Sequence, residues 1–492
     1  MGGGGWRYPS PSRPAPVPTQ ERARDTVRAA IEATVQLLDR EPEQHVTLEA
    51  IRLRSGVSQG SLTHHFGSRD GLIAAAHVER YVRICEADRA FLQPFVGALH
   101  DPQAFVATIL GMVEEMLSEH RHEIRWVRLT AIAAAVGDDD LTRTLGETYT
   151  ALTTSLTTIV ESAHASGILP ADVDARTVAL LLTMHAQGLV LDDLSGVAVD
   201  RATWDHLQSR FVGAFVDPEA AALLQEESQR RSGELWRAEV LGETGRVPET
   251  VATRLAALRV RAGQDGVTTD ASRLRSLIEV AAAATVRDGG RTAGRGAEVF
   301  ETLLRAATVR LRAQGDRGID VTELRTQAGV SPQTFYRLFS TRDALVREAR
   351  VQLEIARAAR SVTRFGALVA SSRTPADLRR AVVDDAMRMA DDAARSAMWQ
   401  RIETIAAART DMELRATLGR VQRAARDLLI EQVCLAQQRK IMDPSLPPTG
   451  IARLLDGSVF WHVFHGLDAQ RPPREVWVGM LSRIAAFLSP DH

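Results

Sequence analysis

The sequence predicts an all-α protein built from two tandem helical domains. The chain has 492 residues, which is too long for one ordinary domain and predicts two to four. Apolar residues recur at helical spacing along most of it, and the alternation typical of strands is scarce. A motif at residues 46–73 recurs at 319–346, 273 positions later and without a gap. Since this period is far too long for a solenoid, the repeat predicts a domain duplication.

The repeated motif predicts two short helices joined by a tight turn, followed by the start of a long third helix. Gly56 and Gly329 provide a residue that can turn the chain between the short helices. Asp320 and Glu323 fit a capping box in the second copy. Side chains suited to N-caps precede the short helices at Thr47, Ser58, Asp320 and Ser331. This geometry presents a helix N-terminus to a partner, as helix-turn-helix DNA-binding domains do.

Both copies of the motif resemble the DNA-binding region of tetracycline-repressor-like (TetR-family) transcriptional regulators. The resemblance is carried by GVSQGSLTHHFGSRDGLI at 56–73 and by GVSPQTFYRLFSTRDALV at 329–346. It implies two tandem TetR-like helical domains. Each would combine a helix-turn-helix DNA-binding region with a helical bundle for ligand binding and dimerisation.

The duplication extends beyond the motif. Residues 126–146 align with 399–419 at the same offset, and 11 of these 21 positions are identical. We therefore expect whole-domain copies at about 20–217 and 293–490. The expected boundaries are a disordered tail at 1–19, a TetR-type helix-turn-helix domain at 20–81, a helical ligand and dimerisation domain at 82–217, a helical linker at 218–292, a second helix-turn-helix domain at 293–354 and a second helical domain at 355–490.

The segment between the two halves has helical spacing at 220–231, 248–261 and 270–287. Two interpretations fit this pattern. The segment is either a helical packing spacer or a third, eroded copy of the DNA reader. The segment contains no sequence like the Gly-Val-Ser turns at 56–58 and 329–331, and this favours the spacer.

The resemblance implies that the second short helix of each motif enters the major groove and that its first turns meet base edges. In the first copy, the residues expected to contact DNA are Thr47, Ser58, Gln59, Gly60, Ser61, Thr63, His64 and His65. In the second copy they are Ser331, Pro332, Gln333, Thr334, Tyr336 and Arg337.

The two motifs differ in how well their residues are suited to binding DNA. Family members usually carry Tyr where this chain has Thr63 and Tyr336, so only the second copy retains a phenol that reaches a phosphate. Residues 21–73 hold 7 Arg and 8 acidic residues, whereas 294–346 hold 8 Arg and 6 acidic residues. Phosphate attraction dominates affinity, so we expect the second copy to bind DNA better. The first copy is either a weaker DNA reader or a retained packing module.

The helices after each motif would form a ligand pocket and a dimer seam, again by resemblance. The seam would use 174–194 with 201–216, and 447–468 with 474–488. The halves would then pair as an intramolecular pseudo-dimer; a homodimer with four readers also fits. Candidate pocket residues, each also compatible with ordinary core packing, are Met112, Met116, Trp126, Tyr149, His185, Met387, Trp399, Met412, Trp461 and His465.

Enzymatic and metal-binding functions are disfavoured. The sequence has no phosphate-binding Gly loop, nucleophile elbow or HExxH motif, and we expect no cofactor. His462 and His465 have helical spacing, but no Cys or acidic partner completes a metal site. Two cysteines, no apolar signal segment and no membrane-length apolar run predict a cytoplasmic, nucleoid-associated protein.

The sequence thus predicts a sequence-specific DNA-binding transcriptional regulator. We expect a repressor that is released from double-stranded operator DNA by a small apolar effector. The alternative is a helical ligand-binding or partner-binding protein in which one or both DNA readers are degenerate.

Overall fold

The computed structural model of the chain describes residues 19–41, 43–97, 99, 101–241, 271–283, 295–315, 318–388 and 392–490. These residues form helices joined by turns, and no strand occurs among them, which confirms the predicted all-α class. Residues 1–18 of the tail predicted at 1–19 and the helix predicted at 248–261 lie outside the described residues, and Thr19 begins a helix.

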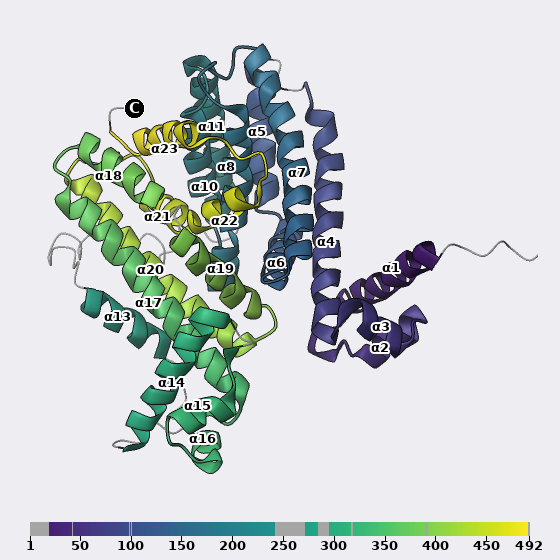
Figure 1. Cartoon of the computed structure of the whole chain (residues 1–492). Coiled ribbons are helices and arrows are strands. Elements are labelled where there is room, and N and C mark those ends of the chain that lie inside the picture. The colour runs from purple at the N-terminus through teal and green to yellow at the C-terminus, as the bar shows by residue number, and fades with distance from the viewer. Residues whose placement is uncertain are drawn as a thin grey trace, which may run out of the picture. The chain divides into compact units, whose positions relative to one another are not determined.

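The chain divides into two compact units, residues 1–80 and 81–492. The first unit holds α1 (Thr19–Leu38), η1 (Glu43–His45), α2 (Leu48–Ser55), α3 (Gln59–Phe66) and the first part of α4 (Arg69–Leu92) (Figure 1). Its core is a cluster that includes Ala30, Ile51, Leu62 and Leu72. Burial of these apolar side chains packs α2 and α3 against α1 and α4.

The second unit, residues 81–492, contains all the remaining helices. Those before residue 242 are η2 (Gln93–Phe95), α5 (Pro102–Met116), α6 (Glu119–Ala134), α7 (Asp139–Ala165), α8 (Ala175–Gly188), α9 (Val190–Ser195), α10 (Arg201–Gly213) and α11 (Pro218–Leu241). Those after residue 270 are α13 (Ala271–Ala283), α14 (Arg295–Gln314), α15 (Val321–Gln327), α16 (Pro332–Phe339), α17 (Arg342–Ser371), α18 (Pro375–Arg388), α19 (Asp392–Ala407), α20 (Met412–Gln438), α21 (Pro448–Gly457), α22 (Val459–Leu467) and α23 (Arg474–Phe487).

Within the second unit, helices from before residue 217 pack directly against helices from after residue 390. α6 contacts α19, α9 contacts α20, and α8 contacts both α21 and α22 (Figure 1). Close approach at the α8–α21 crossing depends on glycine, since a Cβ on Gly188 would lie 3.2 Å from the Gly457 Cα atom. The predicted seam segments 174–194 and 447–468 therefore include helices that touch one another.

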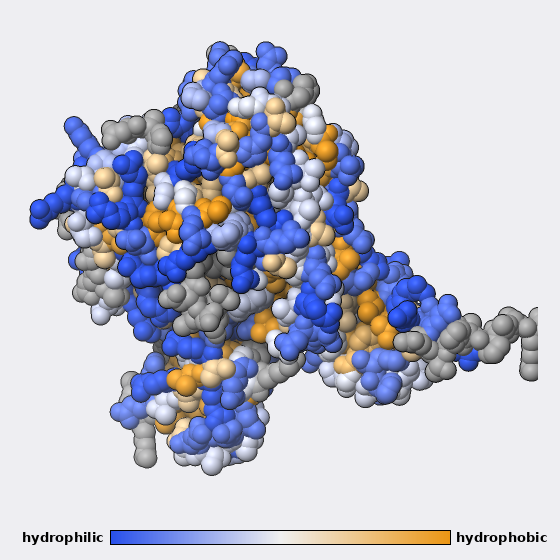
Figure 2. All heavy atoms as spheres, turned by 45° about the horizontal axis from the view of Figure 1, so that its top comes forward, coloured by the Kyte–Doolittle hydropathy of each residue, from blue (hydrophilic) through white to orange (hydrophobic). Residues whose placement is uncertain are grey.

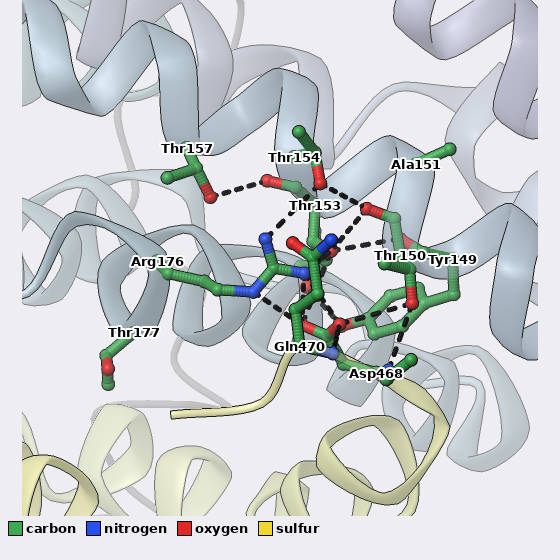
Figure 3. A network of polar contacts seen from close by, with 12 residues as sticks. Tyr149, Thr150, Ala151, Thr153, Thr154, Thr157, Arg176, Thr177, Asp468 and Gln470 are labelled. Atoms are coloured by element: carbon green, nitrogen blue, oxygen red, sulfur yellow. Dashed lines mark hydrogen bonds and ion pairs between the residues drawn. The ribbon is translucent and has the colours of Figure 1, made fainter. Parts of the chain in front are cut away.

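A buried polar network also joins these two sets of helices (Figure 3). Arg176 on α8 forms an ion pair of 2.6 Å with Asp468, which directly follows α22 and has no exposed side-chain area. Thr150 and Thr153 on α7 donate hydroxyl hydrogen bonds to the same carboxylate, at 3.2 and 3.4 Å. The carboxylate thus accepts from three side chains of the first half, and it also accepts from the amide of Gln470 at 2.9 Å.

Local caps and helix length also shape this unit. Ser118 caps α6 by accepting a hydrogen bond from the Arg121 amide, so the helix begins at Glu119. The third helix of the second motif, α17, is long and continues to Ser371.

Hydrophilic residues cover most of the face shown in Figure 2, and hydrophobic residues gather in smaller areas between them. The apolar faces of the amphipathic helices therefore point mainly inward. Among the described residues, no helix is long and apolar enough to cross a membrane.

Candidate functional site

The first motif folds into the predicted helix–turn–helix because its caps and its turn glycine act as expected. The Thr47 hydroxyl accepts a hydrogen bond of 3.1 Å from the Ala50 amide at the start of α2. Gly56 ends α2 with φ of +70°, a conformation that favours glycine. The Ser58 hydroxyl then accepts from the Ser61 amide at 3.2 Å and starts α3.

The second motif has the same plan, with one correction. Ser331 caps α16 by accepting from the Thr334 amide at 3.1 Å, and Gly329 has φ of +63°. Asp320 caps α15 as expected by accepting from the Glu323 amide at 3.1 Å, which is one half of the predicted capping box. The other half is replaced, because the Glu323 carboxylate binds Arg310 instead, at 2.6 Å. This ion pair ties α15 to α14.

Aromatic side chains hold α16 in place from behind. Phe335 and Phe339 are buried, and Phe339 stacks on Phe300 of α14 with ring centroids 4.7 Å apart. In the first motif, buried Leu62 stands at the corresponding position of α3, and Phe66 is half-buried. Fixing one face of each short helix leaves the opposite face open to a partner.

Most of the residues predicted to contact DNA are exposed. Ser61 and Thr334 are half-buried, and Thr334 also shares a hydroxyl hydrogen bond of 3.0 Å with Ser331. Tyr336 is 55% exposed, a high value for a large aromatic residue. Exposed positions are Thr47, Ser58, Gln59, Gly60, Thr63, His64, His65, Ser331, Pro332, Gln333, Tyr336 and Arg337.

Two positioning residues were missed by reasoning from the sequence. Arg69, at the start of α4, donates to the Val46 carbonyl at 2.6 Å. Arg342, at the start of α17, donates to the Ile319 carbonyl at 3.2 Å. Each guanidinium holds the third helix against the segment before the first helix of its motif. The repeated Arg-Asp pair at 69–70 and 342–343 was the available signal.

Several arginines near the motifs are engaged by acids of the protein. A hydrogen bond from Arg52 lowers the pKa of Glu49, and one from Arg310 lowers the pKa of Glu323. In the part of the chain that the structure describes, Arg337 on α16 forms no ion pair. Its charge is therefore available to a phosphate or a guanine edge.

Two short helices with an exposed, capped second helix define a helix-turn-helix DNA-binding module. Residues 30–76 match the family model described as bacterial regulatory proteins, tetR family. The match spans α2, α3 and the start of α4, and it supports a DNA-binding transcriptional regulator of this family. No curated protein matches the chain.

A second candidate site is a cavity of about 620 Å³ in the second half of the chain. It is enclosed by α17, α18, α19, α20, α21 and α23, and its volume falls in the range of small-molecule pockets. A related cavity of about 120 Å³ lies between α4, α5, α6, α7 and α8 in the first half. The structure places predicted residues Met112 and Met116 in the lining of this smaller cavity.

The other first-half pocket candidates are in the core. Trp126 is buried, and the Arg415 guanidinium lies 5.1 Å from its ring centroid. The Tyr149 hydroxyl is 2.7 Å from the Thr183 hydroxyl. The His185 ring stacks on Trp204, with ring centroids 4.9 Å apart. These contacts are packing contacts.

The second-half candidates do not coincide with the larger cavity. Met387 and Trp399 lie on α18 and α19 but are outside its lining. Met412 is 68% exposed at the start of α20, so the expectation that it lines a pocket is wrong. Trp461 and His465 fall on α22, and their side chains are outside the described part. Among the described residues, no group of His, Cys, Asp and Glu side chains is suited to a metal ion.

Proposed function

We propose that this protein is a transcriptional repressor in which two copies of one domain act as an intramolecular pseudo-dimer on operator DNA. A small molecule bound in the helical part would release it. As a DNA-binding regulator, it would act on the bacterial nucleoid in the cytoplasm.

The duplication is supported by the correspondence of helix bounds at an offset of 273 residues. α3 spans 59–66 and α16 spans 332–339; α7 spans 139–165 and α20 spans 412–438. The cores of the two motifs also correspond, because Ile51 and Leu62 stand 273 positions before Leu324 and Phe335.

One pair of reciprocal contacts carries the pseudo-dimer proposal. A Cβ on Gly146 of α7 would lie 3.1 Å from the Leu467 carbonyl, and a Cβ on Gly419 of α20 would lie 2.7 Å from the Leu194 carbonyl. Gly146 and Gly419 are 273 positions apart, as are Leu194 and Leu467. The same two positions therefore contact each other in both directions, once with each half providing the glycine. Such reciprocal contacts are the signature of a two-fold interface.

A DNA-binding titration tests the regulator proposal. The protein is mixed with a fluorescent duplex selected from a random pool, and affinity is measured between 50 and 200 mM salt. A reader that contacts phosphates should lose affinity steeply as salt rises. If no duplex is selected and binding does not respond to salt, the protein is a helical ligand- or partner-binding protein with degenerate readers.

A further inference from the structure

The two cavities occupy corresponding places in the two halves but are filled differently. Three lining residues of the smaller cavity correspond to lining residues of the larger cavity at the offset of 273. The pairs are Asp88 and Ser361, Arg128 and Arg401, and Leu156 and Leu429. The volumes are about 120 and 620 Å³. The same site is therefore nearly closed in one half and open in the other.

In the first half, a carboxylate of the protein occupies the polar end of the site. Asp88 accepts a hydrogen bond of 2.6 Å from Arg121 and forms an ion pair with Arg128. All three side chains are largely buried. Because a buried guanidinium is costly without a partner, Asp88 compensates Arg128 inside the site.

In the second half, this carboxylate is missing. Arg401 corresponds to Arg128 and its side chain is only 2% exposed, but Ser361 stands in the place of Asp88. Arg401 lies 3.3 Å from Glu354 and 3.5 Å from Asp456, yet its Nη1 atom has no hydrogen-bond partner among the described residues.

A second buried donor also lacks a hydrogen-bond partner. The Thr363 hydroxyl, also in the lining, is likewise buried without a partner in the described part of the chain. Buried donors without acceptors are rare in folded proteins. The polar end of the open cavity therefore holds two buried donors that have no acceptor among the described residues.

The remaining lining is apolar with an excess of positive charge. Four lining arginines face two lining aspartates; Asp385 is paired with Arg364 at 2.9 Å, and Glu354, just outside the lining, is paired with Arg357 at 2.6 Å. Burial and the nearby guanidinium groups of Arg312, Arg357 and Arg275 lower the pKa of Arg360, which indicates repulsion among these cations. The apolar side chains in the lining include Phe365, Leu368, Met398, Leu429, Leu454 and Ile484.

We propose that the second-half cavity binds one amphipathic monoanion, consisting of an apolar body and a single carboxylate or similar oxyanion. The anion accepts hydrogen bonds from Arg401 and Thr363 and takes the place that Asp88 fills in the first half. The role of this ligand as the effector rests on the proposed function. Its binding to the cavity does not depend on the proposed function. One ligand binds per chain, since the first-half site is occupied by its own ion pairs.

A matched pair of variants tests the proposal. Ser361→Asp supplies an internal carboxylate beside Arg401, and Ser361→Asn is a neutral control of nearly equal size. The fluorescent probes are 1-anilinonaphthalene-8-sulfonate and N-phenyl-1-naphthylamine, which share an apolar body and differ by the anionic group. Binding and stoichiometry are measured by fluorescence titration of the full chain without DNA.

The unmodified protein should bind one anionic probe per chain. Ser361→Asp should weaken this binding by about 10- to 100-fold, the loss expected for a hydrogen bond to a charged group, and Ser361→Asn by less than about threefold. Binding of the neutral probe should change little in either variant. Equal effects of the two variants on the anionic probe, no effect of either, or two bound anions per chain would overturn the proposal. Because no DNA is present, these results do not depend on whether the protein is a regulator.

Discussion

The Arg176 guanidinium of α8 lies 2.6 Å from the Asp468 carboxylate, although 292 residues separate them in the chain. Arg176 is 13% exposed and Asp468 not at all, and the Asp468 carboxylate accepts from Thr150 and Thr153 of the first half as well as from the neighbouring Gln470 amide (Figure 3). The two halves of the second unit are therefore joined by a desolvated ionic contact as well as by apolar packing.

Replacing this carboxylate should weaken the association of the halves. Asp468→Asn leaves the Arg176 charge buried without a counterion, so it should lower the free energy of unfolding by about 3–5 kcal/mol. Asp172→Asn is the matched control, because Asp172 pairs with Arg483 across the same halves but is 72% exposed. The control should cost less than about 1 kcal/mol. Equilibrium unfolding in urea measures both, and equal losses would contradict the assigned role of Asp468.

A pair of glycine variants tests the close approach of α20 to α9. Gly419→Ala would place its Cβ 2.7 Å from the Leu194 carbonyl, so we expect a loss of about 1–3 kcal/mol in the free energy of unfolding. Gly479→Ala on α23 has open space and should be neutral or stabilising by up to about 1 kcal/mol. The comparison is made by thermal and urea unfolding. If Gly419→Ala were as stable as Gly479→Ala, the helices would not approach as closely as described.

The buried His185 predicts a pH-dependent stability. Burial lowers its pKa from the ordinary 6.5 to about 4, with Asp192 opposing the shift. The unfolded chain therefore binds a proton between pH 6.5 and 4 that the folded chain does not, and stability falls as the pH drops through this window. The loss between pH 8 and pH 5 should be about 2 kcal/mol. His185→Gln should remove that part of the pH dependence, while the difference between the two proteins at pH 8 gives the cost of altered packing alone.

The exposed guanidinium of Arg337 predicts a specific change in DNA binding. If it contacts a phosphate, Arg337→Ala should weaken binding to all sequences and reduce the slope of log affinity against log salt by about 1. If it contacts guanine, the variant should lose about 1–3 kcal/mol and relax the sequence preference at one position. Arg305→Ala, which removes the same charge from an exposed position on α14, is the control. Identical behaviour of the two variants would remove α16 from the DNA interface.

Local chemistry made the helix-turn-helix motifs predictable from the sequence. Caps and turn glycines act within three or four residues along the chain. The structure confirms the predicted caps at Thr47, Ser58 and Ser331 and the predicted turn at Gly56. The Glu323 half of the capping box failed because a residue 13 positions away, Arg310, competes for the carboxylate. Long-range partners of this kind are not visible in local sequence patterns.

The larger cavity was not predictable in the same way. Aromatic residues and methionines were natural candidates, yet Trp126 is used for packing and Met412 faces solvent. Ser361 stands in the lining of the larger cavity at the position where the smaller cavity has Asp88. The offset of 273 pairs these two residues in the sequence, but only the folded chain places both of them in a cavity lining.

The number of chains on one operator tests most directly whether a single polypeptide holds two cooperating DNA readers. The measurement combines selection of bound duplexes from a random pool with sedimentation analysis of the purified complex. We predict one chain per duplex and a site with two unlike half-sites, because the two reader helices differ at nearly every exposed position. A perfect inverted repeat occupied by two chains would contradict intramolecular pairing.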